Sequence, residues 1–81
     1  MTRQRVTSKK NLKNPILIQF AKKVKMRRCE LGLTQEELAE RAHMHVNYIG
    51  AIERAVRNVS LKKIVDLARA LELSPKELML D

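Results

Sequence analysis

Helix start signals divide this chain into short segments, and they constrain its fold more than any other feature. Asn14 precedes Pro15, Ser60 precedes an apolar helical pattern, and capping boxes begin at Thr34 and Ser74. An Asn, Ser or Thr side chain at such a place accepts a backbone N–H that the first helical turn leaves unpaired, and Pro suits the first helical position. The sequence therefore predicts short helices joined by tight links.

Apolar residues follow each start signal at helical spacing, and Gly32 suits the left-handed residue that ends a helix. With 81 residues the chain has room for one domain, since a domain usually takes roughly 100–200 residues. We therefore predict an all-α fold, a compact five-helix bundle. Its helices are expected at about 15–31, 35–42, 46–54, 61–71 and 75–80.

Basic residues gather toward the N-terminus. The formal net charge is +8, yet the first acidic residue is Glu30. Clustered positive charge indicates nucleic-acid binding, although a solubilising tail or attraction to an anionic membrane would also account for it. Aromatic residues are limited to Phe20 and Tyr48, which argues against binding of single strands by base stacking. Residues 1–14 lack an apolar helical pattern, so we expect a disordered basic arm there and a folded domain at 15–81.

Several other classes of protein are excluded by residue chemistry. Cys29 is the single cysteine, so no intrachain disulfide can form, and we expect the chain to be cytoplasmic. No apolar run has the roughly 18 residues of a membrane span, and the N-terminus does not resemble a signal peptide. His43 and His45 with Cys29 do not make a zinc pattern, and Glu36 and Glu37 belong to a capping box. We expect no enzyme activity, no metal and no cofactor.

The segments 35–42 and 46–54 have helix-turn-helix proportions, but their spacing alone does not distinguish a DNA-binding unit from an ordinary small bundle. The motifs of the chain resemble those of the lambda-repressor/Cro-type helix-turn-helix family. These motifs are residues 31–39 (LGLTQEELA), 48–54 (YIGAIER), 57–61 (RNVSL) and 67–71 (LARAL). Within that family they are most similar to the controller proteins of restriction–modification systems, which are stand-alone dimers.

The resemblance implies that segment 46–54 enters the DNA major groove and that segment 35–42 crosses the backbone. The residues expected to be exposed toward the bases are Val46, Asn47, Ala51 and Arg57, with Gly50 as a surface that permits close approach. Asn47 has paired donor and acceptor atoms that suit adenine, whereas Val46 offers only methyl contact, for instance with thymine. We therefore expect specificity to depend on DNA shape as well.

The backbone-contacting residues implied by the resemblance are Gln35, Tyr48, Arg54 and Asn58. Gln35 falls in the first turn of a helix, where free N–H groups and the helix dipole favour an anion, although it can also be an ordinary surface residue. Tyr48 is either a hydroxyl donor to a phosphate or a packing ring. Arg57 can meet a phosphate or a groove edge, and each residue of this loop can instead face solvent.

Other positions carry structural expectations from the same resemblance. Arg28 and Glu53 are expected to form an ion pair, so neither is expected to bind DNA or act in catalysis. His43, His45 and Ala55 depart from the family pattern, which has Gly, a better N-cap residue and Gly at these places. We expect the DNA-binding unit to be less stable than the family average as a result.

We expect a homodimer through the helix 5 region, because Leu78, Met79 and Leu80 are more apolar than a free helix end requires. Part of this apolar surface must cover the helix at 15–31, and the remainder is expected to form the interface. The alternative is a monomer with a frayed end. The predicted function is a sequence-specific transcriptional regulator that binds double-stranded DNA, with half-sites about 34 Å apart in a pseudo-palindrome. A protein partner such as RNA polymerase is compatible with this role. The alternative functions are an antitoxin-like adaptor that binds a protein, or a non-specific basic nucleic-acid-binding protein.

Overall fold

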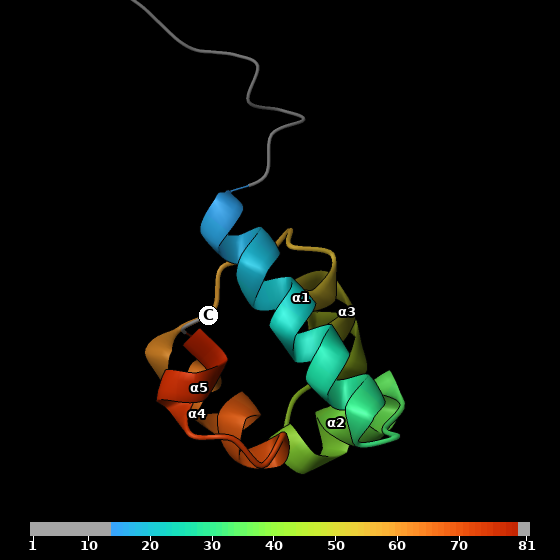
Figure 1. Ribbon diagram of the computed structural model, residues 1–81. Helices are drawn as coiled ribbons and strands as arrows, with labels where there is room; N and C mark the ends of the chain where they lie inside the picture. Colours follow the sequence, from blue (N-terminus) through green and yellow to red (C-terminus); the bar gives the residue numbers. More distant parts are fainter. Residues whose placement is uncertain (1–13, 80–81) are drawn as a thin grey trace, which may run out of the picture.

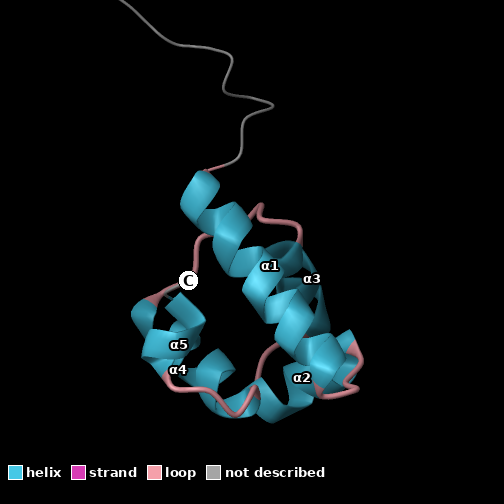
Figure 2. Ribbon diagram, viewed as in Figure 1, coloured by secondary structure: helices cyan, strands magenta, loops and turns pink. Residues whose placement is uncertain are grey.

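A computed structural model describes residues 14–79, and within that range the chain is helical with no strand (Figure 1, Figure 2). Its helices are α1 (Pro15–Glu30), α2 (Gln35–Ala42), α3 (Val46–Glu53), α4 (Leu61–Ala70) and α5 (Pro75–Met79). The predicted all-α five-helix bundle is confirmed. The helices α1, α3 and α4 each end earlier than predicted, because Leu31, Arg54 and Leu71 are C-cap residues. The predicted arm, apart from Asn14, and Leu80 lie outside the described residues.

Side-chain caps begin these helices at the places where the sequence predicts them. Asn14 Oδ1 accepts the N–H of Ile16 at 2.8 Å. Thr34 forms a reciprocal capping box at the start of α2. Glu77 makes the matching contact in α5, where its carboxylate accepts the N–H of Ser74 at 2.8 Å. This backbone hydrogen bond lowers the pKa of Glu77 from its usual value. Each helix entry is therefore specified by local sequence.

Several links use a left-handed residue to leave a helix. Gly32 has φ +71°, as expected for the end of α1. His43, Ala55 and Glu72 also have positive φ, at 58°, 61° and 61°. These three residues carry a Cβ, which clashes with the following carbonyl in this conformation. The links after α2, α3 and α4 are therefore strained relative to the same links with glycine.

The core lies between α1 on one side and the other helices behind and below it (Figure 1). Helix α3 packs against α1 and α2, α2 also packs against α4, and α5 packs against α4 and α1. The largest fully buried side chains come from every helix: Val24, Leu38, Ile49, Ile52, Leu67, Leu71 and Leu78.

Burial of Leu78 corrects the expectation that this side chain forms a dimer interface. Its exposure is 0%, because α5 folds back and inserts Leu78 into the core of its own chain. Met79 is 53% exposed and remains accessible. The apolar end of the chain is therefore divided between the core and the surface.

Candidate nucleic-acid interface

The helices α2 and α3 are joined by a tight turn that fixes their relative position. The N–H of Met44 donates to the carbonyl of Ala39 at 2.9 Å, and His43 supplies the left-handed residue. His45 Nδ1 accepts the N–H of Asn47 at 3.0 Å, so an imidazole caps the start of α3. This hydrogen bond requires Nδ1 to be unprotonated. The first turn of α3 is consequently anchored by a side chain from the turn itself.

The exposed surface of α3 is narrower than the sequence predicts. Asn47 is exposed and Val46 is half-buried against the core. Ala51 is only 8% exposed, so the expectation that it is open to the bases is wrong. Gly50 is also buried, since the Arg54 Nη1 atom lies 3.1 Å from the place where a Cβ would stand. Helix α3 packs against both α1 and α2, and the Arg54 side chain covers Gly50.

A buried charge network joins α1, α2 and α3 beside this surface. Arg28 Nε donates to Glu53 Oε2 at 2.7 Å, and Arg28 Nη2 donates to Oε1 at 3.1 Å. The two side chains are 13% and 4% exposed, and Arg28 also donates to the carbonyl of Leu33. The hydrogen bonds with Glu53 raise the pKa of Arg28. This geometry makes the pair a structural element, with both charges compensated inside the protein.

Gln35 belongs to the same network, which the sequence pattern does not predict. Its Nε2 donates to Glu53 Oε1 at 3.0 Å. Its Oε1 lies 3.9 Å from the Cβ position of Gly50, on the same side as the guanidinium of Arg54. The Gln35 amide and the Arg54 guanidinium therefore lie on the same side of Gly50, at the start of α2 and the end of α3. Helical spacing carries no signal for the contact of Gln35 with Glu53, because that contact joins two different helices.

A basic cluster forms around Tyr48, on the side of α3 that faces the following loop. The ring of Tyr48 is half-buried, with the Arg57 guanidinium 4.9 Å and the Lys63 ammonium 5.2 Å from its centroid. Its hydroxyl donates to the carbonyl of Asn58 at 3.4 Å. Tyr48 thus packs against the core and also orders the loop, and its role toward a phosphate stays a prediction. The sequence gives no role to Lys63, because helical spacing alone does not bring it beside Tyr48.

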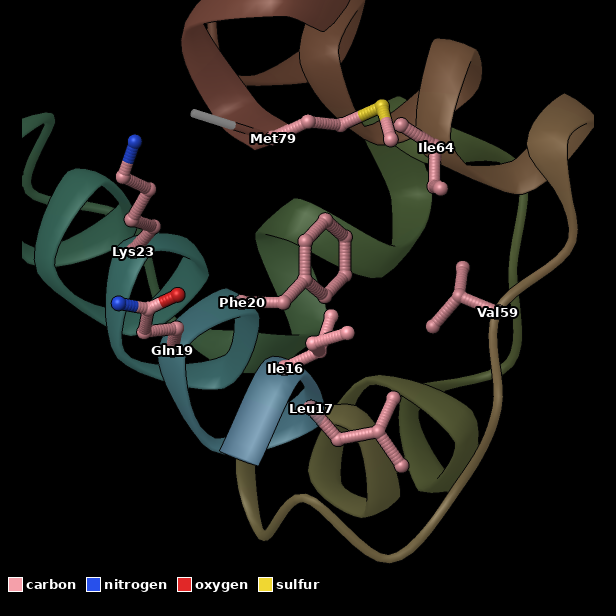
Figure 3. Close-up of a pocket in the computed structure, with 8 residues that line it drawn as sticks. All are labelled: Ile16, Leu17, Gln19, Phe20, Lys23, Val59, Ile64 and Met79. Carbon is pink, nitrogen blue, oxygen red and sulfur yellow. The ribbon is translucent and has the colours of Figure 1, made fainter. Parts of the chain in front are cut away.

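Among residues 14–79 no group of three or more His, Cys, Asp or Glu side chains could hold a metal ion. No helix within the same range is long and apolar enough to cross a membrane. An apolar pocket does open between the first half of α1, the start of α4 and the end of α5 (Figure 3). Phe20 lies at its centre, with Met79 and Ile64 opposite Ile16.

The capped helix α3 presents Asn47 next to Tyr48 and its basic neighbours Arg57 and Lys63, and a tight turn joins α3 to α2. This arrangement defines a helix-turn-helix protein. The profile of the helix-turn-helix family HTH_3 matches residues 24–78, and the chain belongs to this family.

Known proteins resemble this chain in sequence, and solved structures resemble it in fold. Control protein C.BamHI of Bacillus amyloliquefaciens is 40% identical over 67 residues, covering 82% of this chain and 83% of that protein. The restriction-modification controller protein C.AhdI of Aeromonas hydrophila superposes with a TM-score of 0.75 at 42% identity, covering 76% of this chain and 94% of that chain. A chain of the restriction-modification controller protein C.Esp1396I, from the structure of its tetramer in complex with its natural 35 base-pair operator, superposes with a TM-score of 0.77 at 32% identity. The match covers 82% of this chain and 87% of that chain.

Proposed function

We propose that this protein is a sequence-specific transcriptional regulator of the restriction-modification controller type, which binds double-stranded DNA in the bacterial cytoplasm. The observation that carries the proposal is the position of Asn47, exposed at the capped start of α3 and next to Tyr48 with its basic neighbours Arg57 and Lys63. Two further findings support the proposal: the chain belongs to a helix-turn-helix family, and C.Esp1396I, a protein of the same fold, has been solved in complex with its operator. Residues 1–14 would add phosphate attraction as a basic arm.

The contacts on the two sides of α3 differ in kind. Asn47 can address adenine through its paired donor and acceptor, and Val46 can contact a thymine methyl group. Arg54 with Gln35 on one side, and the loop of Arg57 and Asn58 with Tyr48 on the other, would hold backbone phosphates. Arg57 also has the reach to enter a groove edge. Because few side chains can contact bases, sequence-dependent DNA shape contributes to the specificity.

A homodimer would present two α3 helices to half-sites about one helical turn apart. The surface best suited to this contact is the apolar pocket beside Met79, rather than the buried Leu78. Ile16, at its edge, is 73% exposed, which is more apolar surface than a monomer requires. An isologous contact of this face would bury both residues in each copy.

The decisive experiment selects bound sites from random duplexes at a fixed salt concentration. We expect a pseudo-palindrome with half-sites one helical turn apart. Asn47→Ala should relax selection at one base pair in each half-site, because it removes a bidentate base contact worth about 1–3 kcal/mol. Asn58→Ala, the matched control, should weaken binding to all sequences alike. Selection that returns no preferred sequence would refute the proposed function.

A further inference from the structure

A groove between α1 and the end of α3 carries positive charge that the contacts described above do not use. Lys22 and Lys25 line it from α1, and Arg54, Ala55 and Val56 line it from α3 and the following residues. Glu53 also reaches this groove, but its carboxylate is bonded to Arg28. The groove therefore presents a net positive surface.

The two lysines are placed to act together. They lie three residues apart on α1, so their side chains share one helical face. Both are exposed, and within residues 14–79 no acidic side chain pairs with either of them. At a rise of about 1.5 Å per residue, Lys22 and Lys25 are about 4.5 Å apart along the helix. One DNA strand advances about 3.4 Å per phosphate, so the two ammonium groups can meet neighbouring phosphates.

Arg54 makes this groove continuous with the candidate interface. Its guanidinium packs over Gly50, near Gln35, and Arg54 is also one of the residues that line the groove with Lys22 and Lys25. Basic residues thus lie on both walls of the groove, at the end of α3 and on α1. Val56, which is 56% exposed, adds an apolar edge that can lie against a deoxyribose.

We propose that Lys22 and Lys25 bind backbone phosphates of the duplex outside the half-site read by α3. The ligand is the phosphodiester backbone, so the contact adds affinity without sequence preference. This inference rests on the proposed function, since it requires the duplex to lie along α3. Continuity with Arg54 favours DNA over an acidic protein surface as the occupant of the groove.

The test compares Lys22→Gln/Lys25→Gln with Arg69→Gln/Lys76→Gln, a control that removes the same number of positive charges. Arg69 forms an ion pair with Asp66 at 3.3 Å on the surface of α4, and Lys76 is exposed on α5. Binding to the selected site is measured across a salt series, on duplexes with long flanks and with flanks trimmed to the site. Thermal unfolding verifies that both variants are folded.

On the full site, which two copies of the chain occupy, the slope of log K against log salt should fall by about 3.6 for Lys22→Gln/Lys25→Gln, because four lysines per dimer no longer neutralise a phosphate and each contributes about 0.9. The slope for the control should stay near that of the wild type. Trimming the flanks should weaken the wild type and have no further effect on the first variant. The inference is overturned if the slope of Lys22→Gln/Lys25→Gln equals that of the wild type, or if trimming the flanks weakens this variant as much as it weakens the wild type. Specific binding by the wild type would still support the proposed function in that case. Failure of the wild type to bind any preferred site overturns both.

Discussion

Glu53 links three helices through a single carboxylate, which makes it the residue whose loss should matter most for stability. It accepts hydrogen bonds from Arg28 and Gln35 and is 4% exposed. Removing one partner of a buried ion pair leaves the other charge uncompensated, at a cost of about 3–5 kcal/mol. We expect Glu53→Gln to lower the free energy of unfolding by about 3 kcal/mol, measured by urea denaturation.

Glu30→Gln is the matched control, because Glu30 also pairs with an arginine of α1 but is 60% exposed. An exposed pair of this kind contributes about 0–1 kcal/mol, so little change is expected. The double variant Arg28→Met/Glu53→Leu should recover part of the stability that Glu53→Gln removes, since no unpaired charge remains. Equal, small effects of Glu53→Gln and Glu30→Gln would contradict a structural role for the buried pair.

Glu72 provides a second residue-scale prediction, based on backbone strain. It has φ 61° at the end of α4, and its exposed side chain makes only a 3.5 Å ion pair with Arg41. An L-residue in the left-handed region costs about 1–2 kcal/mol relative to the right-handed one, and glycine largely avoids this cost. We expect Glu72→Gly to raise the free energy of unfolding by about 1 kcal/mol, visible as a higher melting temperature.

Glu72→Ala separates strain from charge, because it removes the same carboxylate and keeps the Cβ. It should show no gain over the wild type. If both variants were stabilised equally, the cause would be removal of the carboxylate rather than relief of the left-handed conformation.

At the scale of the elements, the helix boundaries were predictable because caps are local. The hydroxyl of Thr34, the amide of Asn14 and the capping box from Ser74 to Glu77 depend on residues within one turn of each other. Their geometry therefore follows from the order of residues alone. The predicted helix ends were less accurate by one residue. Leu31 and Leu71 are C-cap residues that continue the apolar pattern of α1 and α4, and the C-cap of α3 is Arg54.

The wrong expectations concern burial, which depends on how elements pack. Ala51 belongs to a helix that packs against both α1 and α2, and only this packing shows that its side chain is covered. Leu78 was expected at a dimer interface because its burial depends on α5 folding back onto α4 and α1, which the sequence pattern does not show. Tyr48 and Lys63 meet across a loop, and no periodicity of the sequence predicts such a contact. The side chains expected to contact DNA remain predictions.

The N-cap of α3 yields a prediction for this element. His45 Nδ1 accepts the N–H of Asn47, so His45→Ala leaves that donor without its partner and should cost about 1 kcal/mol. His45→Asn keeps an acceptor of suitable length and should equal or exceed the wild type in stability. Hydrogen exchange of the Asn47 amide measures the effect on α3 directly. Unaltered exchange in His45→Ala would show that the cap does not stabilise this helix.

For the whole molecule, two kinds of surface lie on different parts of the bundle. The charged surface follows α3 and one face of α1, whereas the apolar pocket lies between the first half of α1, α4 and α5 (Figure 3). A dimer formed through the pocket would leave both charged surfaces open to one duplex. This separation allows DNA binding and self-association to be tested independently.

Met79→Lys is the variant that tests the dimer, because it places a charge at the pocket without altering the core. Burying a methionine contributes about 1.5–3 kcal/mol, and an isologous interface contains the residue twice, so self-association should weaken about 100-fold or more. Met26→Lys is the control, since Met26 is 63% exposed and does not line the pocket. Sedimentation equilibrium should show a monomer for Met79→Lys alone.

Disruption of the dimer should have a distinct effect on DNA binding. Met79→Lys should bind the complete pseudo-palindrome much more weakly than the wild type, yet bind an isolated half-site equally well, because only the energy linking the two copies is removed. Met26→Lys should match the wild type on both duplexes. A Met79→Lys protein that remains dimeric would place the self-association surface elsewhere, and the exposed Leu61 and Val65 on α4 would be the next residues to change.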